Sequence, residues 1–190
     1  MTVSDTTAAP PRFGAALRRL YFIRVVFAFA WAALVFTVAG SSGPLLTALL
    51  VVYPLFDAGA VLWQLRSKDR VPGSPQAAEW INVAVSVTVA IALGWASTVS
   101  PATALIVWGV WAIGSGIPQL VAALRRWRTG GQLPQVLSGG LSVLAGSAFL
   151  LQGLQGSGDI AGVGGYAAVG GVFFLVSAIR LTVLLRKKAS

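Results

Sequence analysis

The sequence predicts an all-α membrane protein in which six helices cross the bilayer as three repeated helical hairpins. Three observations support this fold class: the composition, the spacing of the basic residues and the position of the turn-forming residues. Of the 190 residues, 56% are hydrophobic and 10% are charged, and the mean hydropathy is +0.81. A soluble globular domain carries about 25% charged residues. This chain therefore lacks the polar surface that a water-soluble fold of its size requires.

The 14 basic residues occur in four clusters separated by long apolar stretches. Each stretch holds roughly 40–55 residues, enough for two spans of about 20 residues and a turn. Each stretch is therefore expected to form a hairpin that crosses the membrane and returns to the same side. The clusters are Arg12, Arg18, Arg19 and Arg24; Arg66, Lys68 and Arg70; Arg125, Arg126 and Arg128; and Arg180, Arg186, Lys187 and Lys188.

Glycine, proline and serine residues mark the turns between the expected spans. Turns have to lie at the membrane interfaces, because a broken helix inside lipid would leave backbone N–H and C=O groups without partners. We expect a mobile cytoplasmic tail over 1–16, a helix bundle over 17–185 and a basic cytoplasmic tail over 186–190. The hairpins are 17–66, 77–125 and 133–185, and the spans are 17–39, 45–65, 77–96, 101–124, 133–151 and 162–185.

The distribution of basic residues predicts the orientation of the chain. All four clusters fall on one side of the predicted topology, and the three turns on the other side contain none. Because cytoplasmic loops carry the excess of Lys and Arg, both termini are expected in the cytoplasm. A net charge of +9 would favour nucleic-acid binding in a soluble domain. Here the basic residues flank spans, so we expect the lipid bilayer as partner and no nucleic acid, with a homo-oligomer left open.

The returning spans share a sequence pattern that indicates an internal repeat. An aromatic residue is followed, after three residues, by two small or polar residues. The aligned positions are Tyr53, Trp111 and Tyr166; Asp57, Ser115 and Gly170; and Ala58, Gly116 and Gly171.

Small residues spaced four or seven apart favour close packing of membrane helices. Lipid gives helices no hydrophobic reason to associate, so small side chains let backbones approach and gain dispersion contacts. The candidate packing positions are Ala58, Ala112, Gly116, Gly139, Ser142, Gly146, Ala167 and Gly171.

Segments of three spans resemble the HdeD-like acid-resistance membrane proteins, small six-span bacterial proteins of unknown function. The segments are 111–125, 53–58 and 137–146, and the resemblance covers about residues 17 to 185. Ala58 stands where that family usually has Gly after the Asp, and the third span matches poorly. The resemblance implies a multi-pass protein of the bacterial plasma (inner) membrane with a role in acid or stress tolerance. It implies no catalytic or transport residues.

Asp57 is the strongest candidate for a functional intramembrane residue. It lies nine residues before Arg66, roughly 13 Å deep along a helix. An acidic residue at such depth costs roughly 2.5–3.5 kcal/mol, so we expect an ion pair with Arg24 on the neighbouring span. Two interpretations stay open: a structural pin between two helices, or a site that takes up a proton.

Other polar residues of the spans are few, and no enzyme chemistry is expected from them. Asn82 and Ser86 share a face of the third span, and Gln119 lies on the fourth. With no Cys and no His, imidazole-based catalysis, thiol chemistry and the usual zinc sites are excluded. We expect no catalytic residue, no metal and no cofactor.

Two functions are compatible with the sequence. The first is a non-enzymatic membrane protein of the HdeD-like kind that contributes to acid or stress tolerance or to membrane integrity. The alternative is a small transporter or channel with a protonatable Asp57. A channel or transporter needs a continuous polar path, and only Asp57, Asn82 and Gln119 are evident candidates for it.

Overall fold

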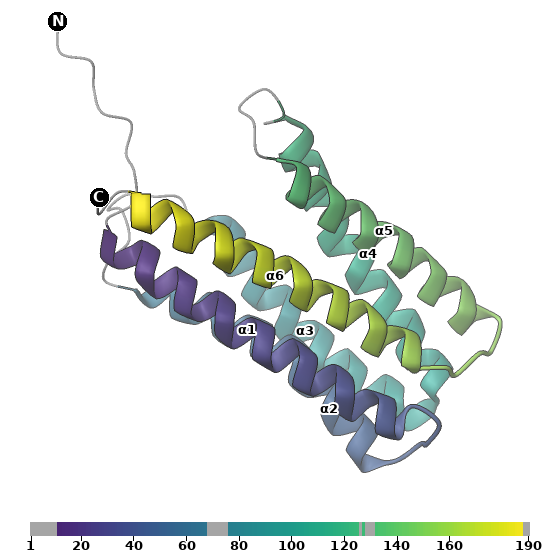
Figure 1. Ribbon diagram of the computed structural model, residues 1–190. Coiled ribbons are helices and arrows are strands. Elements are labelled where there is room, and N and C mark those ends of the chain that lie inside the picture. Colours follow the sequence, from purple (N-terminus) through teal and green to yellow (C-terminus); the bar gives the residue numbers. More distant parts are fainter. Residues whose placement is uncertain (1–10, 68–75, 126, 128–131, 188–190) are drawn as a thin grey trace, which may run out of the picture.

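The computed structural model describes residues 11–67, 76–125, 127 and 132–187, which form six α-helices (Figure 1). All six helices are long and apolar enough to cross a membrane. The predicted all-α fold with six spans is therefore confirmed, and the chain is an integral, multi-pass membrane protein. The helices are α1 (Pro11–Val38), α2 (Pro44–Arg66), α3 (Ala77–Val99), α4 (Pro101–Arg125), α5 (Leu133–Leu154) and α6 (Ala161–Lys187).

The helices extend slightly beyond the predicted spans. The first begins at Pro11 rather than Leu17, which suits a proline because its fixed φ and missing N–H are tolerated in the first turn. The last continues to Lys187, into the predicted basic tail. The rest of the two predicted tails, 1–10 and 188–190, lies outside the described residues. The same holds for Lys68, Arg70, Arg126 and Arg128.

Local side-chain chemistry sets the helix ends at the turns that hold no basic residue. Ser100 precedes Pro101, and its Oγ accepts a hydrogen bond of 3.0 Å from the backbone N–H of Thr103, as a helix N-cap does. The Oδ1 of Asp159 accepts a 2.9 Å bond from the N–H of Ala161, where a negative charge is favoured by the helix dipole. Asp159 therefore has a structural role at the start of α6.

The helices form a closed ring. Each packs against its neighbours in chain order, and α1 closes the ring against α6. The most extensive contacts are α4–α5, α1–α6 and α2–α3, whereas α1–α2 and α5–α6 touch sparingly. The two helices of each predicted hairpin are therefore not the most closely packed pairs, and the three-hairpin repeat stays a prediction.

Glycine explains the close contact of α4 with α5. A Cβ added to Gly109 would lie 2.6 Å from the carbonyl oxygen of Gly146, and one on Gly116 would lie 2.8 Å from that of Gly139. Only a residue without a side chain fits at such distances. The small-residue pattern thus predicted the packing faces of these two helices, although Gly109 was not among the candidate positions.

The remaining candidate packing positions also lie at helix contacts. Ala58, Ala112, Ser142 and Ala167 are buried. A Cβ on Gly171 would lie 3.2 Å from the Cβ of Ala28 on α1. Small residues therefore contribute to several interfaces around the ring.

The half of the bundle away from the basic helix ends is tightly packed. We call it the closed half. Its indole pair, Trp31 and Trp108, stacks at 5.6 Å between ring centroids, and the Nε1 of Trp31 donates a 2.7 Å hydrogen bond to the carbonyl oxygen of Leu49. Other buried residues of the closed half are Val35, Leu46, Leu50, Leu93, Leu105, Phe149, Ile160 and Val163.

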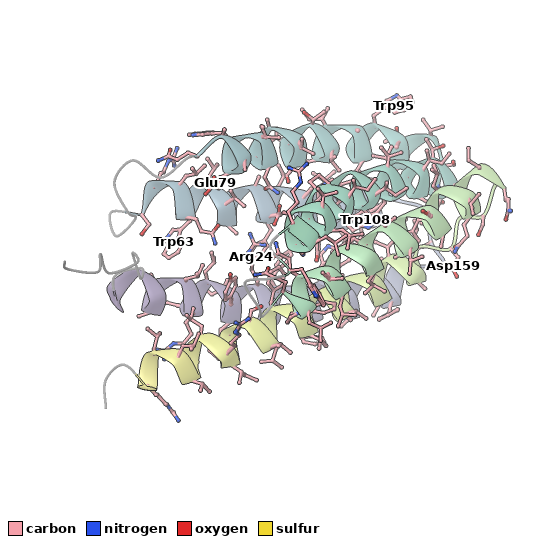
Figure 2. All side chains as sticks on the ribbon, turned by 90° about the horizontal axis from the view of Figure 1, so that it is seen from above. Arg24, Trp63, Glu79, Trp95, Trp108 and Asp159 are labelled. Atoms are coloured by element: carbon pink, nitrogen blue, oxygen red, sulfur yellow. The ribbon has the colours of Figure 1, made fainter. Side chains whose placement is uncertain are left out.

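Exposed tryptophans lie toward the helix ends. Figure 2 shows Trp63 toward one end of the bundle and Trp95 toward the other, with Asp159. Both indoles are exposed, as are those of Trp80 and Trp127. Tryptophan favours the membrane interface because its ring is apolar and its N–H is polar.

Candidate functional site

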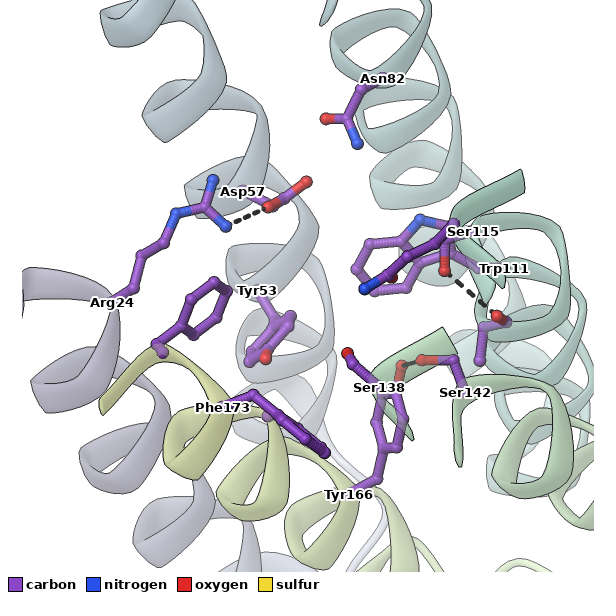
Figure 3. Close-up of a pocket in the computed structure, with 14 residues that line it drawn as sticks. Arg24, Tyr53, Asp57, Asn82, Trp111, Ser115, Ser138, Ser142, Tyr166 and Phe173 are labelled. Carbon is purple, nitrogen blue, oxygen red and sulfur yellow. Dashed lines mark hydrogen bonds and ion pairs between the residues drawn. The ribbon is translucent and has the colours of Figure 1, made fainter. Parts of the chain in front are cut away.

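A central cavity of ≈ 310 Å³ occupies the half of the bundle nearer the basic helix ends. We call this half the open half. All six helices contribute side chains to the lining, and Figure 3 shows them facing a common space. Each helix supplies at least one polar residue. In the order α1 to α6, these include Arg24, Asp57, Asn82, Ser115, Ser138 and Tyr166.

Arg24 and Asp57 form an ion pair at the edge of this cavity. The Nη1 of Arg24 donates a hydrogen bond of 2.8 Å to the Oδ1 of Asp57. The Oγ of Ser86 donates one of 3.2 Å to the other carboxylate oxygen, so α1, α2 and α3 meet at this carboxylate. The structure thus contains the predicted contact and adds Ser86 as a second donor.

The arginine is more enclosed than the carboxylate. Its side chain is 11% exposed and that of Asp57 is 22% exposed. The Cζ of Arg24 lies 5.0 Å from the centroid of the Phe174 ring, a distance at which the ring face attracts a cation. The guanidinium is thereby held between α2 and α6.

Three aromatic residues line the cavity on the side of the closed half. Tyr53, Trp111 and Tyr166 are the residues that the repeat pattern aligns, and all three face the cavity. Tyr53 packs at 5.5 Å and Trp111 at 5.3 Å from Trp108, between ring centroids. We call Tyr53, Trp111 and Tyr166 the aromatic floor.

A hydrogen bond at the aromatic floor connects α5 to α6, two helices that otherwise contact each other sparingly. The hydroxyl groups of Ser142 and Tyr166 are hydrogen-bonded at 2.9 Å. Beyond the floor, the closed half contains buried apolar and aromatic side chains. The cavity therefore has a packed end and cannot be followed through the whole bundle in this conformation.

A second cavity of ≈ 440 Å³ adjoins the first between α5 and α6. The two share Gln119, Ser138, Phe173 and Phe174 in their linings. The second cavity reaches residues near the basic helix ends, including Gln132 and Arg180. The two adjoining cavities therefore lie between the basic end of the bundle and the ion pair.

The structure places most of the predicted polar residues at this site. Asn82 and Gln119 line the cavity, and Ser86 binds Asp57. Ser138 and Phe173 were not predicted, because a serine and a phenylalanine within an apolar span carry no local signal of a cavity. The aligned positions Tyr53 and Trp111 carried such a signal, since repeats place equivalent residues around a common centre.

The arrangement is suited to binding a polar solute. Within the described ranges, no three His, Cys, Asp or Glu side chains lie close enough together to hold a metal ion. The groups that face the cavity are hydroxyls, amides, aromatic rings and one ion pair. Such convergent polar groups in a concave, largely apolar site are typical of small-molecule binding.

Comparison with protein-family models, curated proteins and solved structures gives no match for this chain. The class defined by the fold and the cavity is therefore an integral membrane protein with six apolar helices around a central polar chamber. The resemblance to HdeD-like proteins stays a prediction.

Proposed function

We propose that this protein is a small transporter or channel that binds a polar solute in its central cavity. The observation that carries the proposal is that all six helices supply residues to one cavity beside an intramembrane ion pair. Polar groups inside a membrane are costly and typically mark a solute or ion path. A membrane protein with a purely structural role does not need polar side chains gathered around one cavity.

We also propose that the basic end faces the cytoplasm of a bacterial plasma membrane. Arg18, Arg66, Arg125 and Arg186 lie toward this end of four different helices, and an excess of basic residues favours the cytoplasmic side. In this orientation both termini are cytoplasmic and the two adjoining cavities open inward. The closed half then separates the solute from the outside.

The orientation and the accessibility of the cavity can be tested without knowing the solute. The natural chain contains no cysteine, so single Ser→Cys variants can be labelled directly. Ser115→Cys and Ser138→Cys place a thiol in the cavity lining. We expect both to react with a membrane-impermeant methanethiosulfonate in inverted vesicles and to stay unreactive in spheroplasts.

Two control variants have thiols outside the cavity. Thr88→Cys lies on an exposed surface of α3, and Ala104→Cys lies in the closed half, where the native residue is 1% exposed. Neither is expected to react from either side. Cavity thiols that stay unreactive in both preparations would refute the solute-binding function, and reaction only in spheroplasts would reverse the orientation.

The second candidate is the HdeD-like role in acid tolerance or membrane integrity. Its support is the sequence resemblance of segments 53–58, 111–125 and 137–146 to that family. A strain that lacks the gene would then survive acid challenge poorly and regain survival with the wild-type chain. Equal survival with and without the gene would exclude this role.

A further inference from the structure

The inference concerns the chemical class of the solute, and it rests on the solute-binding function proposed above. It starts from the charge of the central cavity. In the described lining, Arg24 and Asp57 are the charged residues, and they are bound to each other. Ser86 donates a further hydrogen bond to the same carboxylate. The central cavity is therefore neutral overall, and its two charges already have partners.

A neutral cavity inside a membrane does not favour an ion. An ion that leaves water for such a site loses its hydration and finds no free charge of opposite sign. Taking one partner away from a buried pair leaves an unpaired charge, which is strongly destabilising. We therefore expect the Arg24–Asp57 pair to stay intact when a solute binds, and the solute to carry no net charge.

Other polar groups of the lining have unused hydrogen-bonding capacity. The side-chain amides of Asn82 and Gln119 line the cavity, as do the hydroxyls of Tyr53 and Ser138. None of these four groups has a hydrogen-bond partner among the described residues. Polar groups in the interior of a protein normally have a partner. The partners are therefore expected to come from what occupies the cavity.

The unused groups donate as well as accept hydrogen bonds. An amide does both, and so does a hydroxyl. Ser142 and Tyr166 share one hydrogen bond between their hydroxyls, so one of their two O–H groups stays free to donate. A solute that matches this mixture has to donate and accept at several points, which is the property of a compound with several hydroxyl groups.

The aromatic floor favours a solute that also has an apolar face. The floor presents ring surface to the cavity, and Phe173 and Phe174 add more. The C–H groups on one face of a sugar or a cyclic polyol can pack against such rings through dispersion contacts. A volume of ≈ 310 Å³ is at the small end of the range for ligand sites, about 300–1,000 Å³. A single ring is therefore expected rather than a chain of them.

We propose that the central cavity binds a small, neutral, polyhydroxylated solute of the size of one sugar ring. Its hydroxyls exchange hydrogen bonds with Tyr53, Asn82 and Gln119, and its C–H face packs against the aromatic floor. The Arg24–Asp57 pair stays closed beside it. No covalent bond forms or breaks.

The test is protection of a thiol in the cavity. It is measured on the purified full chain in phosphatidylcholine nanodiscs, where both faces of the membrane are accessible. Ser115→Cys reports on the central cavity, because Ser115 lines it and its hydroxyl bonds the carbonyl of Ala112 on its own helix. The neutral probes are glucose and myo-inositol. The ionic counterparts of glucose are glucuronate and, at mildly acidic pH, glucosamine.

A bound solute shields the thiol from the methanethiosulfonate reagent. We expect glucose and myo-inositol to slow the reaction at least about fivefold at several times their dissociation constants, and the two ions to slow it much less. Ser67→Cys, which follows α2 and lies outside both cavity linings, should react at the same rate with and without every probe. Protection by an ion that matches the better neutral probe, or no protection by either neutral probe, would overturn the proposal.

Two variants test the contacts with the solute, each added to Ser115→Cys. Tyr53→Phe removes a hydroxyl that has no partner among the described residues and keeps the ring, so the fold is expected to persist. Gln119→Leu removes an amide of the lining. Each should raise the concentration of neutral probe needed for half-protection about fivefold, the equivalent of about 1 kcal/mol. Unchanged protection in either variant would show that the proposal is wrong.

Gln64→Leu is the matched control for Gln119→Leu. Gln64 lies on α2 outside both cavity linings, so its loss should leave protection unchanged. If it weakens protection as much as Gln119→Leu does, the effect does not come from the cavity and the proposal fails.

The reactivity of the cavity thiol separates this inference from the function on which it rests. A Ser115→Cys thiol that reacts but is protected by neither neutral probe would refute the polyhydroxylated solute alone. A thiol that does not react at all would refute the solute-binding function as well.

Discussion

The closed and open halves of the bundle are built from the same six helices and differ in what lies between them. In the closed half, Trp31 and Trp108 fill the centre, and both are at most 2% exposed. In the open half, the centre of the bundle is a cavity beside Arg24 and Asp57. The difference shows that the helices are held together at one end by packing and meet around polar groups at the other.

The uneven contacts around the ring explain how one bundle accommodates both halves. Close approach of α4 and α5 depends on glycine along the shared face, so these helices stay together over their length. The contact of α5 with α6 is sparse, and Figure 1 shows the two helices separating toward the end that holds the termini. The second cavity lies in this gap.

The largest expected effect comes from removing the centre of the closed half. Trp108→Ala removes a fully buried indole, and a large-to-small change of this kind costs about 3–5 kcal/mol. The matched change in the open half, Trp111→Ala, should cost less, because Trp111 already borders a cavity. Reversible unfolding in mixed micelles with sodium dodecyl sulfate, followed by circular dichroism, measures both. Equal losses would show that the two halves do not differ in packing.

A smaller effect is expected at the α4–α5 contact that supports both halves. Gly109→Ala places a methyl group 2.6 Å from a backbone oxygen, and overpacking of this kind costs about 1–3 kcal/mol. The free energy of unfolding in the same micelles measures the loss.

Gly114→Ala on the same helix is the control, since its added Cβ meets no atom within 4 Å. Its effect should stay within about 0.5 kcal/mol. If both glycine variants unfold at the same detergent fraction, close approach of the backbones does not limit stability here.

The sequence predicted the closed half less well than the ion pair. Hydropathy and the basic clusters predicted the six spans, because a segment's ability to cross a membrane depends on its length and composition alone. The contact of Arg24 with Asp57 was predicted from the similar depth of the two residues in the membrane. Two opposite charges at equal depth on neighbouring helices have few other partners in lipid. Trp108 carried no such signal, because its burial depends on how six helices close into a ring.

The cavity was only partly predictable for the same reason. Asp57, Asn82 and Gln119 could be identified as unusual in apolar spans. Whether they share a space depends on the rotation of each helix, and short apolar windows of nearly uniform hydropathy do not fix that rotation. The aligned positions Tyr53 and Trp111 came closest to predicting it, because equivalent residues of a repeat tend to face the same centre.

The smallest expected effect concerns the hydrogen bond that crosses the α5–α6 gap. Ser142→Ala removes the hydroxyl that contacts Tyr166 and keeps the Cβ that packs beside Gly116. Hydrogen bonds between membrane helices contribute about 0.6 kcal/mol on average, so a loss of that size is expected in the micelle assay. Ser147→Ala is the control, because its hydroxyl bonds the carbonyl of Val143 on its own helix and should contribute almost nothing to helix association. If Ser142→Ala leaves stability unchanged while Ser147→Ala lowers it, the bridge does not hold α5 to α6, and the sparse contacts between these helices suffice to keep the open half together.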